Sequence, residues 1–338
     1  MATIKEIAQL AGVSRGTVDR VLNHRGAVNP QTAQRVTEIA QALNYQPNRA
    51  GIVLAAQKRN LKIGVLLFDN GNPFFEEVMK GVRQKEEELQ GYNCSVLVSR
   101  AGFDAGAQLK SMEYLEAQGA NGIILSPCND PLICSKINEM SRRGIPVITT
   151  NTDIRHSLRL AYVGCDFYRS GETAAGLMHL IGGPQIYAGI VTGSSQVLCH
   201  TDRIAGFCDR IRSHYPHIQI VDTIENSDDE LESYDGTLAL LHKNPQINAL
   251  YFAAGGVHGG CRAVLAAGRR DITVISCDKV PTTREMLLDG IIDATICQQP
   301  AIQGSRPLDL MFTYLTTGQK PEKEYHYTAV DIRIRENL

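Results

Sequence analysis

The sequence of 338 residues lacks the features that mark membrane proteins and exported proteins. It has no uninterrupted apolar run of about 18 residues, which is the length that a membrane-spanning helix requires. Its first residues do not form a basic stretch followed by an apolar one, so we expect no export signal. The sequence therefore predicts a protein that works in the cytoplasm without contacting a membrane.

The common catalytic motifs are also missing. The sequence has no Gly-x-Ser-x-Gly elbow, no nucleotide-binding phosphate loop, no metal-ligand cluster and no paired-carboxylate motif. The glycine-rich run from Gly255 to Gly260 lacks the Lys-Ser/Thr pair of a phosphate loop, so a strand-to-helix turn is the better interpretation. His214 and His217 flank Pro216 in a polar stretch that suits a solvated loop better than a metal site. We therefore predict no catalytic residue, no metal site and no cofactor.

Nine cysteines are scattered between Cys94 and Cys297, with no Cys-x-x-Cys pair and no zinc-finger spacing. Such cysteines behave as small buried hydrophobic residues in a reducing compartment. Hydrophobic residues make up 43% of the chain and charged residues 21%, which is typical of a globular protein with a substantial core.

The charges are distributed unevenly along the chain. Residues 1–60 contain eight Lys or Arg and three Asp or Glu, a formal charge of +5. The rest of the chain then carries −7, because the whole chain carries −2. A small basic module attached to an acidic body suits phosphate binding by the module.

The basic module opens with a helix, a glycine turn and a second helix. Thr3 and Glu6 have the spacing of a capping box at the start of the first helix. Gly12 permits the left-handed backbone that ends it, and Ser14 is placed to cap the second helix. Apolar residues recur at helical spacing in both segments and predict a buried face: Ile4, Ile7, Ala8, Ala11, Val18, Val21 and Leu22.

The second helix leaves Arg15, Gly16, Asp19, Arg20 and Asn23 on its free face. Two short helices joined in this way suit insertion of the second helix into a DNA major groove. An amphipathic helical hairpin with surface arginines also occurs in proteins that never contact DNA, so this pattern alone leaves both interpretations open.

A third helix is predicted from the cap at Asn29 and the first-turn proline Pro30 to about Leu43. Its apolar positions would close a three-helix core, and we expect Val36, Ile39, Ala40 and Leu43 to be buried there. Pro47 ends the helical pattern, and residues 50–60 form a short link.

From Leu61 onward, apolar strand-like runs alternate with amphipathic stretches. Ten strands are expected, at 63–68, 94–99, 122–126, 146–150, 161–164, 186–192, 218–223, 249–253, 273–277 and 294–298. Helices are expected between them, at 75–91, 108–118, 131–143, 168–181, 203–215, 233–243, 259–267, 282–289 and 301–316. Continuous apolar strands with intervening helices predict doubly wound parallel sheets of the α/β class. Ten strands suit two sheets better than one, with a ligand site in the cleft between two lobes.

The whole chain resembles the lactose-repressor (LacI/GalR) family of transcriptional regulators. The N-terminal part carries Thr3-Ile-x-x-Ile-Ala-x-x-Ala-Gly-Val-Ser14, Thr17-Val-x-Arg-Val-Leu-Asn23 and Leu43-Asn-Tyr-x-Pro-Asn-Arg49. The remainder resembles periplasmic sugar-binding proteins of the ribose type through Asn72-Pro-Phe-Phe75, Ile145-Pro-Val-Ile148, Arg203-x-x-Gly-Phe207, Asp278 and Ala294-Thr-Ile-x-Gln298. Two independent motif sets agree where one alone would be weak.

The resemblance implies a helix-turn-helix headpiece, a hinge and two lobes. The headpiece would comprise residues 1–49 and the hinge residues 50–60. The N-lobe would comprise residues 61–164 and 299–327, and the C-lobe residues 165–298 and 328–338.

The resemblance also implies which residues contact DNA. Arg15, Gly16 and Arg20 would lie at base edges, where arginine can bind guanine through two hydrogen bonds. Leu54 would be wedged between base pairs and kink the DNA. The full set of expected DNA contacts is Ser14, Arg15, Gly16, Thr17, Arg20, Asn23, Asn48, Arg49 and Leu54. Asp19 replaces the usual serine of the family, and we expect solvent or an arginine to neutralise it.

The hinge contains Gly51, Ile52 and Val53, which are poor helix formers. We expect this segment to order only when it binds DNA, so that part of the binding free energy offsets its ordering.

The expected ligand site departs from the ribose pattern at several positions. The family's Asp-Arg pair is Asn151-Thr152 here, Gly255 replaces an asparagine, and Ser126 stands near another asparagine position. These changes remove charge and volume, so a larger sugar, polyol or modified sugar is expected instead of ribose, with His258 or Asp153 as extra contacts. The expected contacts are Asn72, Phe74, Phe75, Ser126, Asn151, Thr152, Arg203, Gly255, Asp278 and Gln298. Each could instead be a packing phenylalanine or a surface ion pair.

The sequence thus predicts a ligand-responsive regulator, with repression as the favoured mode, that binds double-stranded operator DNA and a sugar-like effector. Self-association as a homodimer is expected, and a tetramer is compatible with the sequence. Effector-driven release and effector-driven promotion of DNA binding both remain open. A transport binding protein would require an export signal and no headpiece, and an enzyme would require a catalytic motif.

Overall fold

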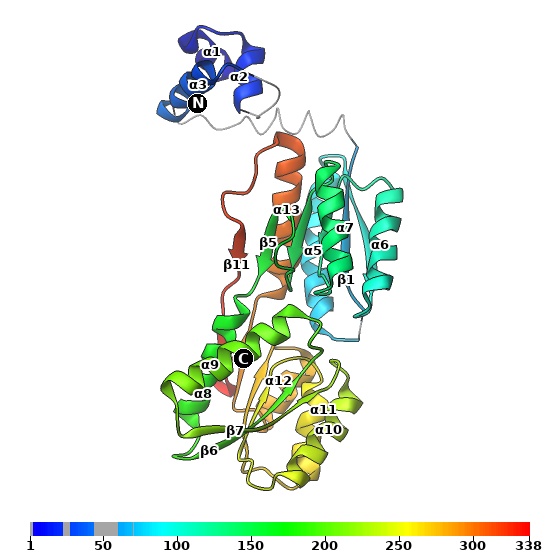
Figure 1. Cartoon of the computed structure of the whole chain (residues 1–338), viewed down its shortest axis with the longest axis vertical. Coiled ribbons are helices and arrows are strands. Elements are labelled where there is room, and N and C mark those ends of the chain that lie inside the picture. The colour runs from blue at the N-terminus through cyan, green and yellow to red at the C-terminus, as the bar shows by residue number, and fades with distance from the viewer. Residues whose placement is uncertain (1–2, 23–27, 44–59, 70) are drawn as a thin grey trace.

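A computed structural model describes residues 3–22, 28–43, 60–69 and 71–338. The headpiece consists of α1 (Ile4–Ala11), α2 (Arg15–Leu22) and α3 (Pro30–Ala42) (Figure 1). The predicted capping box at Thr3 and Glu6 is present, and Gly12 ends α1 with a φ of 64°. The Ser14 hydroxyl accepts a hydrogen bond of 3.1 Å from the amide of Thr17, so the predicted cap of α2 is confirmed.

The three helices share a small apolar core. Its buried members are Ile7, Ala8, Ala11, Val18, Val21, Val36 and Ala40. Ile4, Leu22 and Ile39 are partly buried against this core. The expectation that Leu43 closes the core is wrong: Leu43 follows the last residue of α3 as its C-cap and is 36% exposed.

Two six-stranded sheets follow, one in each lobe. The N-lobe sheet has the order β11-β5-β4-β3-β1-β2, with every adjacent pair parallel. Its strands are β1 (Leu61–Phe68), β2 (Cys94–Ala101), β3 (Gly122–Leu125), β4 (Val147–Thr150), β5 (Ala161–Gly164) and β11 (Tyr325–Tyr327). The three central strands β1, β3 and β4 are almost entirely buried, which explains their continuous apolar sequence.

The C-lobe sheet has the order β12-β10-β9-β8-β6-β7, and only the short edge strand β12 runs antiparallel to its neighbour. Its strands are β6 (Ile186–Thr192), β7 (Ile218–Glu225), β8 (Ala249–Phe252), β9 (Thr273–Cys277), β10 (Ala294–Cys297) and β12 (Asp331–Arg333). The ten strands expected from the sequence are all present. The three-residue strands β11 and β12 were not predicted.

Helices flank both sheets, as expected for doubly wound lobes. The helices of the N-lobe are α5 (Phe74–Gln90), α6 (Ala105–Ala117), α7 (Pro131–Arg142) and α13 (Pro300–Thr317). Those of the C-lobe are α8 (Phe167–Ile181), α9 (Leu198–His214), α10 (Glu230–Lys243), α11 (Val257–Ala266) and α12 (Pro281–Leu288), with a final 3-10 turn η1 (Arg335–Asn337). Figure 1 shows the two lobes stacked along the long axis of the molecule.

The chain passes between the two sheets three times. The connections lie between β5 and α8, between β10 and α13, and between β11 and β12. These three crossing segments are typical of a hinge, because two lobes connected in this way can rotate without disrupting either core.

Paired glycines bring helices of each lobe unusually close together. A Cβ atom added at Gly171 of α8 would lie 2.0 Å from the carbonyl oxygen of Arg203, and one at Gly206 of α9 would lie 1.9 Å from that of Tyr168. Gly81 and Gly304 play the same reciprocal part between α5 and α13. The contact between α8 and α9 fixes the position of Arg203, a predicted ligand-binding residue.

No helix in the described ranges is both long and apolar enough to span a membrane. All nine cysteines lie in described segments and are free, and six of them are buried. The prediction that they serve as small core residues agrees with this burial.

Candidate functional site

Four C-lobe residues of the candidate site follow four strands that are consecutive along the chain. Asp228 follows β7, Gly255 follows β8, Asp278 follows β9 and Gln298 follows β10. Because these strands are parallel, their carboxyl ends meet at one edge of the sheet, which is where ligands bind in open α/β folds. The N-lobe contributes the facing wall.

The N-lobe wall is aromatic. Phe68 at the end of β1 and Phe74 and Phe75 at the start of α5 are each at most 5% exposed. The ring of Phe68 lies edge-on to Phe75 and Phe103, with centroid separations of 5.8 and 4.6 Å. Asn72 holds the loop before α5, because its side-chain oxygen accepts a hydrogen bond of 2.9 Å from the amide of Phe74. This wall offers apolar edges and one amide group to a ligand.

Asp278 is the central acceptor of the C-lobe wall. Its side chain is 18% exposed, and both of its oxygens accept hydrogen bonds of 3.0 Å from the Gln298 amide. Burial raises the pKa of Asp278, although Arg203 and Gln298 act in the opposite direction. The carboxylate therefore retains capacity to accept further hydrogen bonds, which would favour its charged form.

Arg203 presents donors that the protein does not fully use. Its side chain is 4% exposed, Nη1 donates to the carbonyl of Ala253 at 2.8 Å, and Nη2 lies 3.9 Å from Asp278. The guanidinium stacks over Phe167 at 4.7 Å, while Nε is buried without a hydrogen-bond partner. An unsatisfied buried donor is costly, so this group suits a ligand oxygen that would accept from it.

A chain of amides connects the two walls. The Gln303 amide of α13 donates to the Gln298 carbonyl at 2.7 Å and to its side-chain oxygen at 3.1 Å. Asn151, at the end of β4, donates to the Gln303 side chain at 3.3 Å. All three residues are buried, so directional hydrogen bonds connect the residues beside Asp278 to the N-lobe.

Three residues of this site adopt left-handed backbone conformations. The φ angles of Asn151, Asp228 and Asp278 are 64°, 61° and 67°. Asn and Asp tolerate this region better than other residues, but it still costs energy. Strained residues of this kind gather at functional sites, where the surrounding structure holds a side chain in a fixed direction.

Eight of the ten predicted ligand contacts line one cavity between the lobes: Asn72, Phe74, Phe75, Asn151, Arg203, Gly255, Asp278 and Gln298. Ser126 and Thr152 lie outside its lining, and their role as ligand contacts stays a prediction. The Ser126 hydroxyl is fully buried in the N-lobe and donates to the Thr150 carbonyl at 3.0 Å. The Thr152 hydroxyl accepts from the Cys199 amide at 3.2 Å instead.

The lobes already touch across this cavity, which measures about 30 Å³. Asn72 of the N-lobe donates to Asp228 of the C-lobe at 3.3 Å, and the Asn129 amide donates to the Gln196 carbonyl at 2.9 Å. A cavity of this size accommodates about one water molecule. This cavity is smaller than a sugar ring.

In the headpiece, five predicted DNA contacts are described: Ser14 directly before α2, Arg15, Gly16 and Thr17 in its first turn, and Arg20 in its last turn. Arg20 folds back along its own helix, with Nε 3.2 Å from the Gly16 carbonyl and Nη2 3.4 Å from the Thr17 hydroxyl. Asn23, Asn48, Arg49 and Leu54, and most of the hinge, lie outside the described residues.

Comparison with known families agrees with both parts of this structure. Residues 3–48 match bacterial regulatory proteins of the lacI family, and residues 63–320 match the periplasmic binding protein domain. The chain belongs to the lacI family of bacterial regulatory proteins. Its second part is a periplasmic-binding-protein domain that covers more than half of the chain.

Relatives of this lacI-family chain are transcriptional regulators. It is 26% identical to the ribose operon repressor of Halalkalibacterium halodurans, over 83% of this chain and 81% of that protein. It is 29% identical to the probable transcriptional repressor ExuR of Bacillus subtilis, over 83% and 82% of the two chains. It is 30% identical to the sucrose operon repressor of Pediococcus pentosaceus, but there the match spans 57% of this chain and 55% of that protein.

Among solved structures, the two lobes resemble GanP, a glucose-galactose binding protein from Geobacillus stearothermophilus. The identity is 26% and the TM-score is 0.74, over 82% of this chain and 99% of GanP. AraP, an arabinose binding protein from the same organism, gives 25% identity and a TM-score of 0.68 over 82% and 97%.

Sequence reasoning missed several residues that line the cavity of this regulator. Asp228, His200 and Cys199 are the charged or titratable ones, and Phe68 and Phe103 add aromatic surface. Residues 226–228 gave a weak signal, because an Asn-Ser-Asp run after a strand is typical of a tight turn. Nothing in the sequence indicated that Phe103, from the loop after β2, approaches His200 across the cleft with a centroid separation of 6.4 Å.

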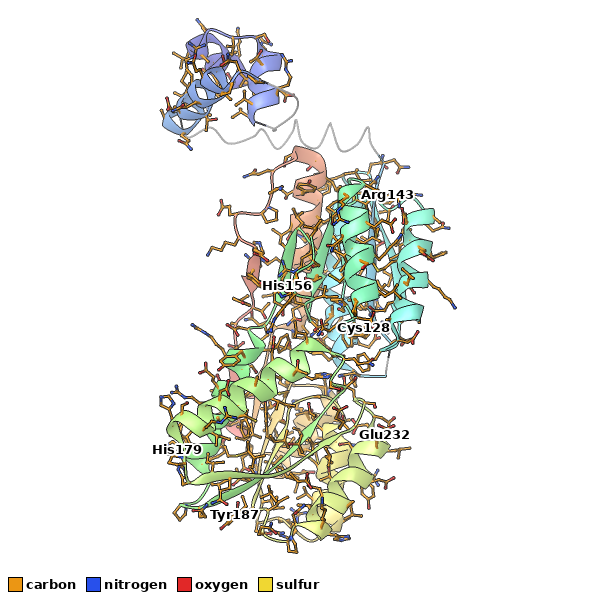
Figure 2. All side chains as sticks on the ribbon, viewed as in Figure 1. Cys128, Arg143, His156, His179, Tyr187 and Glu232 are labelled. Atoms are coloured by element: carbon orange, nitrogen blue, oxygen red, sulfur yellow. The ribbon has the colours of Figure 1, made fainter. Side chains whose placement is uncertain are left out.

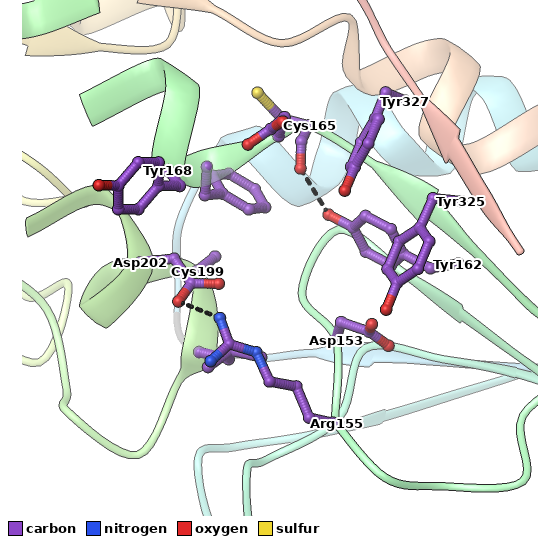
Figure 3. A pocket seen from close by; sticks show the side chains of 12 residues that line it. Asp153, Arg155, Tyr162, Cys165, Tyr168, Cys199, Asp202, Tyr325 and Tyr327 are labelled. Atoms are coloured by element: carbon purple, nitrogen blue, oxygen red, sulfur yellow. Dashed lines mark hydrogen bonds and ion pairs between the residues drawn. The ribbon is translucent and has the colours of Figure 1, made fainter. Parts of the chain in front are cut away.

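A second and larger cavity of about 210 Å³ lies between the lobes beside the connections (Figure 3). It is lined by tyrosines of β5, α8 and β11 and by acidic residues, among them Asp202, which pairs with Arg155 at 2.6 Å. Asp153, considered above as a ligand contact, lines this cavity and is held by Arg159. His258 lies on α11 and lines neither cavity.

The histidines considered above as a possible metal site lie far from the cleft. His217 Nε2 is 3.1 Å from Nδ1 of His179, and the His179 ring stacks on Tyr215 at 4.4 Å. Figure 2 places His179 on the outer surface of the C-lobe. Among the described residues, no group of three potential metal ligands gathers anywhere.

Proposed function

We propose that this regulator is a homodimeric, sugar-responsive transcriptional repressor that acts in the cytoplasm. The observation that carries this proposal is the joining, in one chain, of a helix-turn-helix headpiece to a cleft in which Arg203, Asp278 and Gln298 converge. The names of its relatives, ribose operon repressor and sucrose operon repressor among them, support a sugar or a sugar derivative as the effector.

The cleft has the chemistry that a polyhydroxylated ring requires. A hydroxyl group both donates and accepts, so it can satisfy the Asp278 carboxylate and the unpartnered Nε of Arg203 together. The apolar face of a sugar ring can pack against the phenylalanines of the N-lobe wall. Charge-assisted hydrogen bonds from buried groups give such a site both affinity and direction.

Two headpieces of a dimer would bind two half-sites of a pseudo-palindromic operator. Arg15 and Arg20 would read base edges, while Ser14, Thr17, Asn48 and Arg49 would contact the backbone. Insertion of Leu54 between base pairs would require the hinge to order on DNA. Any movement of the paired N-lobes would therefore change whether both hinge segments can order there together.

For the effector to bind, the cleft would open, take up the ligand and close again. This movement would reach the hinge through the N-lobe. The amide chain from Gln298 through Gln303 to Asn151 is a physical route for that coupling. Coupling free energies in such systems are typically about 1–3 kcal/mol.

A salt titration of operator affinity tests the DNA-binding half of the proposal. We expect the affinity for a duplex from the DNA that flanks its own gene to fall about a thousandfold or more between about 50 and 200 mM salt, because each phosphate contact releases condensed counterions. Fluorescence anisotropy of the labelled duplex measures this dependence. An affinity that does not change with salt would show that the basic headpiece does not bind phosphates.

A further inference from the structure

Hydrogen bonds from both lobes hold the Asp228 side chain in a fixed position. Its amide donates to the Asn226 side chain at 3.0 Å, and its backbone adopts the left-handed conformation noted above. One carboxylate oxygen accepts from the Gly255 amide at 2.9 Å, and the other faces Asn72 of the opposite lobe at 3.3 Å. The carboxylate therefore points out of the C-lobe into the cleft.

Asp228 and Asp278 place two carboxylates in the cleft, each beside one basic side chain. Their side chains are 4% and 18% exposed, and the Asp228 charge is among the influences that raise the pKa of Asp278, after burial. Among the residues that the structure describes, Arg203 is the single arginine in the lining, and no lysine lines the cavity. Two partly desolvated carboxylates thus face any group that enters between the lobes.

His200 completes the surroundings of Asp228. Its Nδ1 lies 3.1 Å from the Ser194 carbonyl and must donate to it, which directs Nε2 toward Asp228 at 3.8 Å. Burial opposes protonation of His200, but Cys199 and Asp228 outweigh it and raise its pKa to about 9. A protonated His200 is matched by Asp228 and leaves no net positive charge for an anionic ligand.

We propose that Asp228 makes the cleft selective for uncharged polyhydroxylated effectors and excludes sugar phosphates and sugar acids. This inference rests on the proposed function and narrows the class of effector. A ligand hydroxyl can replace the Asn72 amide as the donor to Asp228, so an uncharged polyol satisfies the carboxylate. An ionised carboxylate or a phosphate dianion at the same place has no proton to donate to Asp228, and it finds no cation there that an aspartate does not already pair with.

Matched pairs of ligands test this selectivity directly. Thermal shifts are measured for the wild-type chain with D-ribose, D-glucose, D-galactose and myo-inositol, and with ribose 5-phosphate, glucose 6-phosphate, galacturonate and inositol 1-phosphate. We expect at least one uncharged compound to raise the melting temperature, and we expect none of its anionic counterparts to do so.

Asp228→Asn provides the second arm, because asparagine keeps the shape and tolerates the left-handed backbone. We expect its affinity for the uncharged ligand to fall about ten- to a hundredfold, as the loss of a hydrogen bond to a charged group implies. The ratio of its affinity for the uncharged ligand to its affinity for the anionic counterpart should become smaller. Asp235→Asn, on the exposed face of α10, removes the same charge from the same lobe and should change neither value.

The possible failures are distinguishable. A wild-type response to a phosphorylated or acidic sugar would overturn the selectivity and leave a sugar-responsive regulator standing. An Asp228→Asn chain that binds both members of the pair as the wild type does would likewise overturn it. The absence of a response to every compound would contradict the sugar-responsive function itself.

Discussion

Replacing Asp278 by asparagine nearly abolishes the thermal stabilisation that the effector gives to the wild-type chain. The wild type at an effector concentration of 100 times Kd gains about 2.7 kcal/mol. Loss of charge-assisted hydrogen bonds to Asp278 weakens binding by up to about a hundredfold. At the same effector concentration the variant is then only half saturated and gains about 0.4 kcal/mol. The measurement is a thermal shift with the uncharged compound that stabilises the wild type most.

Asparagine is preferred to alanine here because the φ of 67° at this position strains an alanine more. Asp289→Asn, at the exposed C-cap of α12, is the matched control and should respond like the wild type. The wild-type affinity should also weaken as the pH falls through the raised pKa of Asp278, whereas the Asp278→Asn affinity should not show that fall. A variant that keeps the full stabilisation would show that the ligand binds elsewhere.

Replacing Arg20 by alanine weakens operator binding by about 1–3 kcal/mol, or roughly 5- to 150-fold, because an arginine at a base edge can hold guanine through two hydrogen bonds. The loss should be much smaller on unrelated DNA, since phosphate contacts dominate there. Anisotropy titrations with the operator duplex and with a scrambled duplex of the same length measure both affinities.

Arg35→Ala is the matched control for this prediction. Arg35 is exposed on α3, so its removal subtracts the same charge from a different helix of the headpiece. We expect Arg35→Ala to lower the affinity for both duplexes by the same small factor. Equal losses on the two duplexes for Arg20→Ala would show that Arg20 contributes only charge.

Local chemistry made much of the fold predictable. Three local signals mark helix ends, namely the capping box of Thr3 and Glu6, the left-handed Gly12 and the proline at the start of α3, and the structure contains all three. The central strands are apolar on both faces because helices cover both faces, so their sequence alone identifies them. The edge strands β11 and β12 have three residues each, which alternate between exposed and partly buried positions. They therefore contain no apolar run to detect.

The candidate site was less predictable, because its residues meet only after two sheets form and the lobes come together. Asn72, Asp278 and Gln298 stand in recognisable sequence patterns, whereas Asp228 and His200 do not. Their role depends on a strained turn and on the packing of α9, neither of which leaves a periodic signal. Ser126 and Thr152 lie close to strand ends, yet hydrogen bonds within and between the lobes already engage their hydroxyls.

The central claim is that one ligand site in the cleft controls DNA binding by the headpiece. The most direct measurement is the affinity for the operator duplex, by anisotropy, at increasing concentrations of the stabilising sugar. We predict a change in operator Kd of about 5- to 150-fold in the wild type and no such change in Asp278→Asn. An operator affinity that stays constant while the same sugar stabilises the protein would contradict the account.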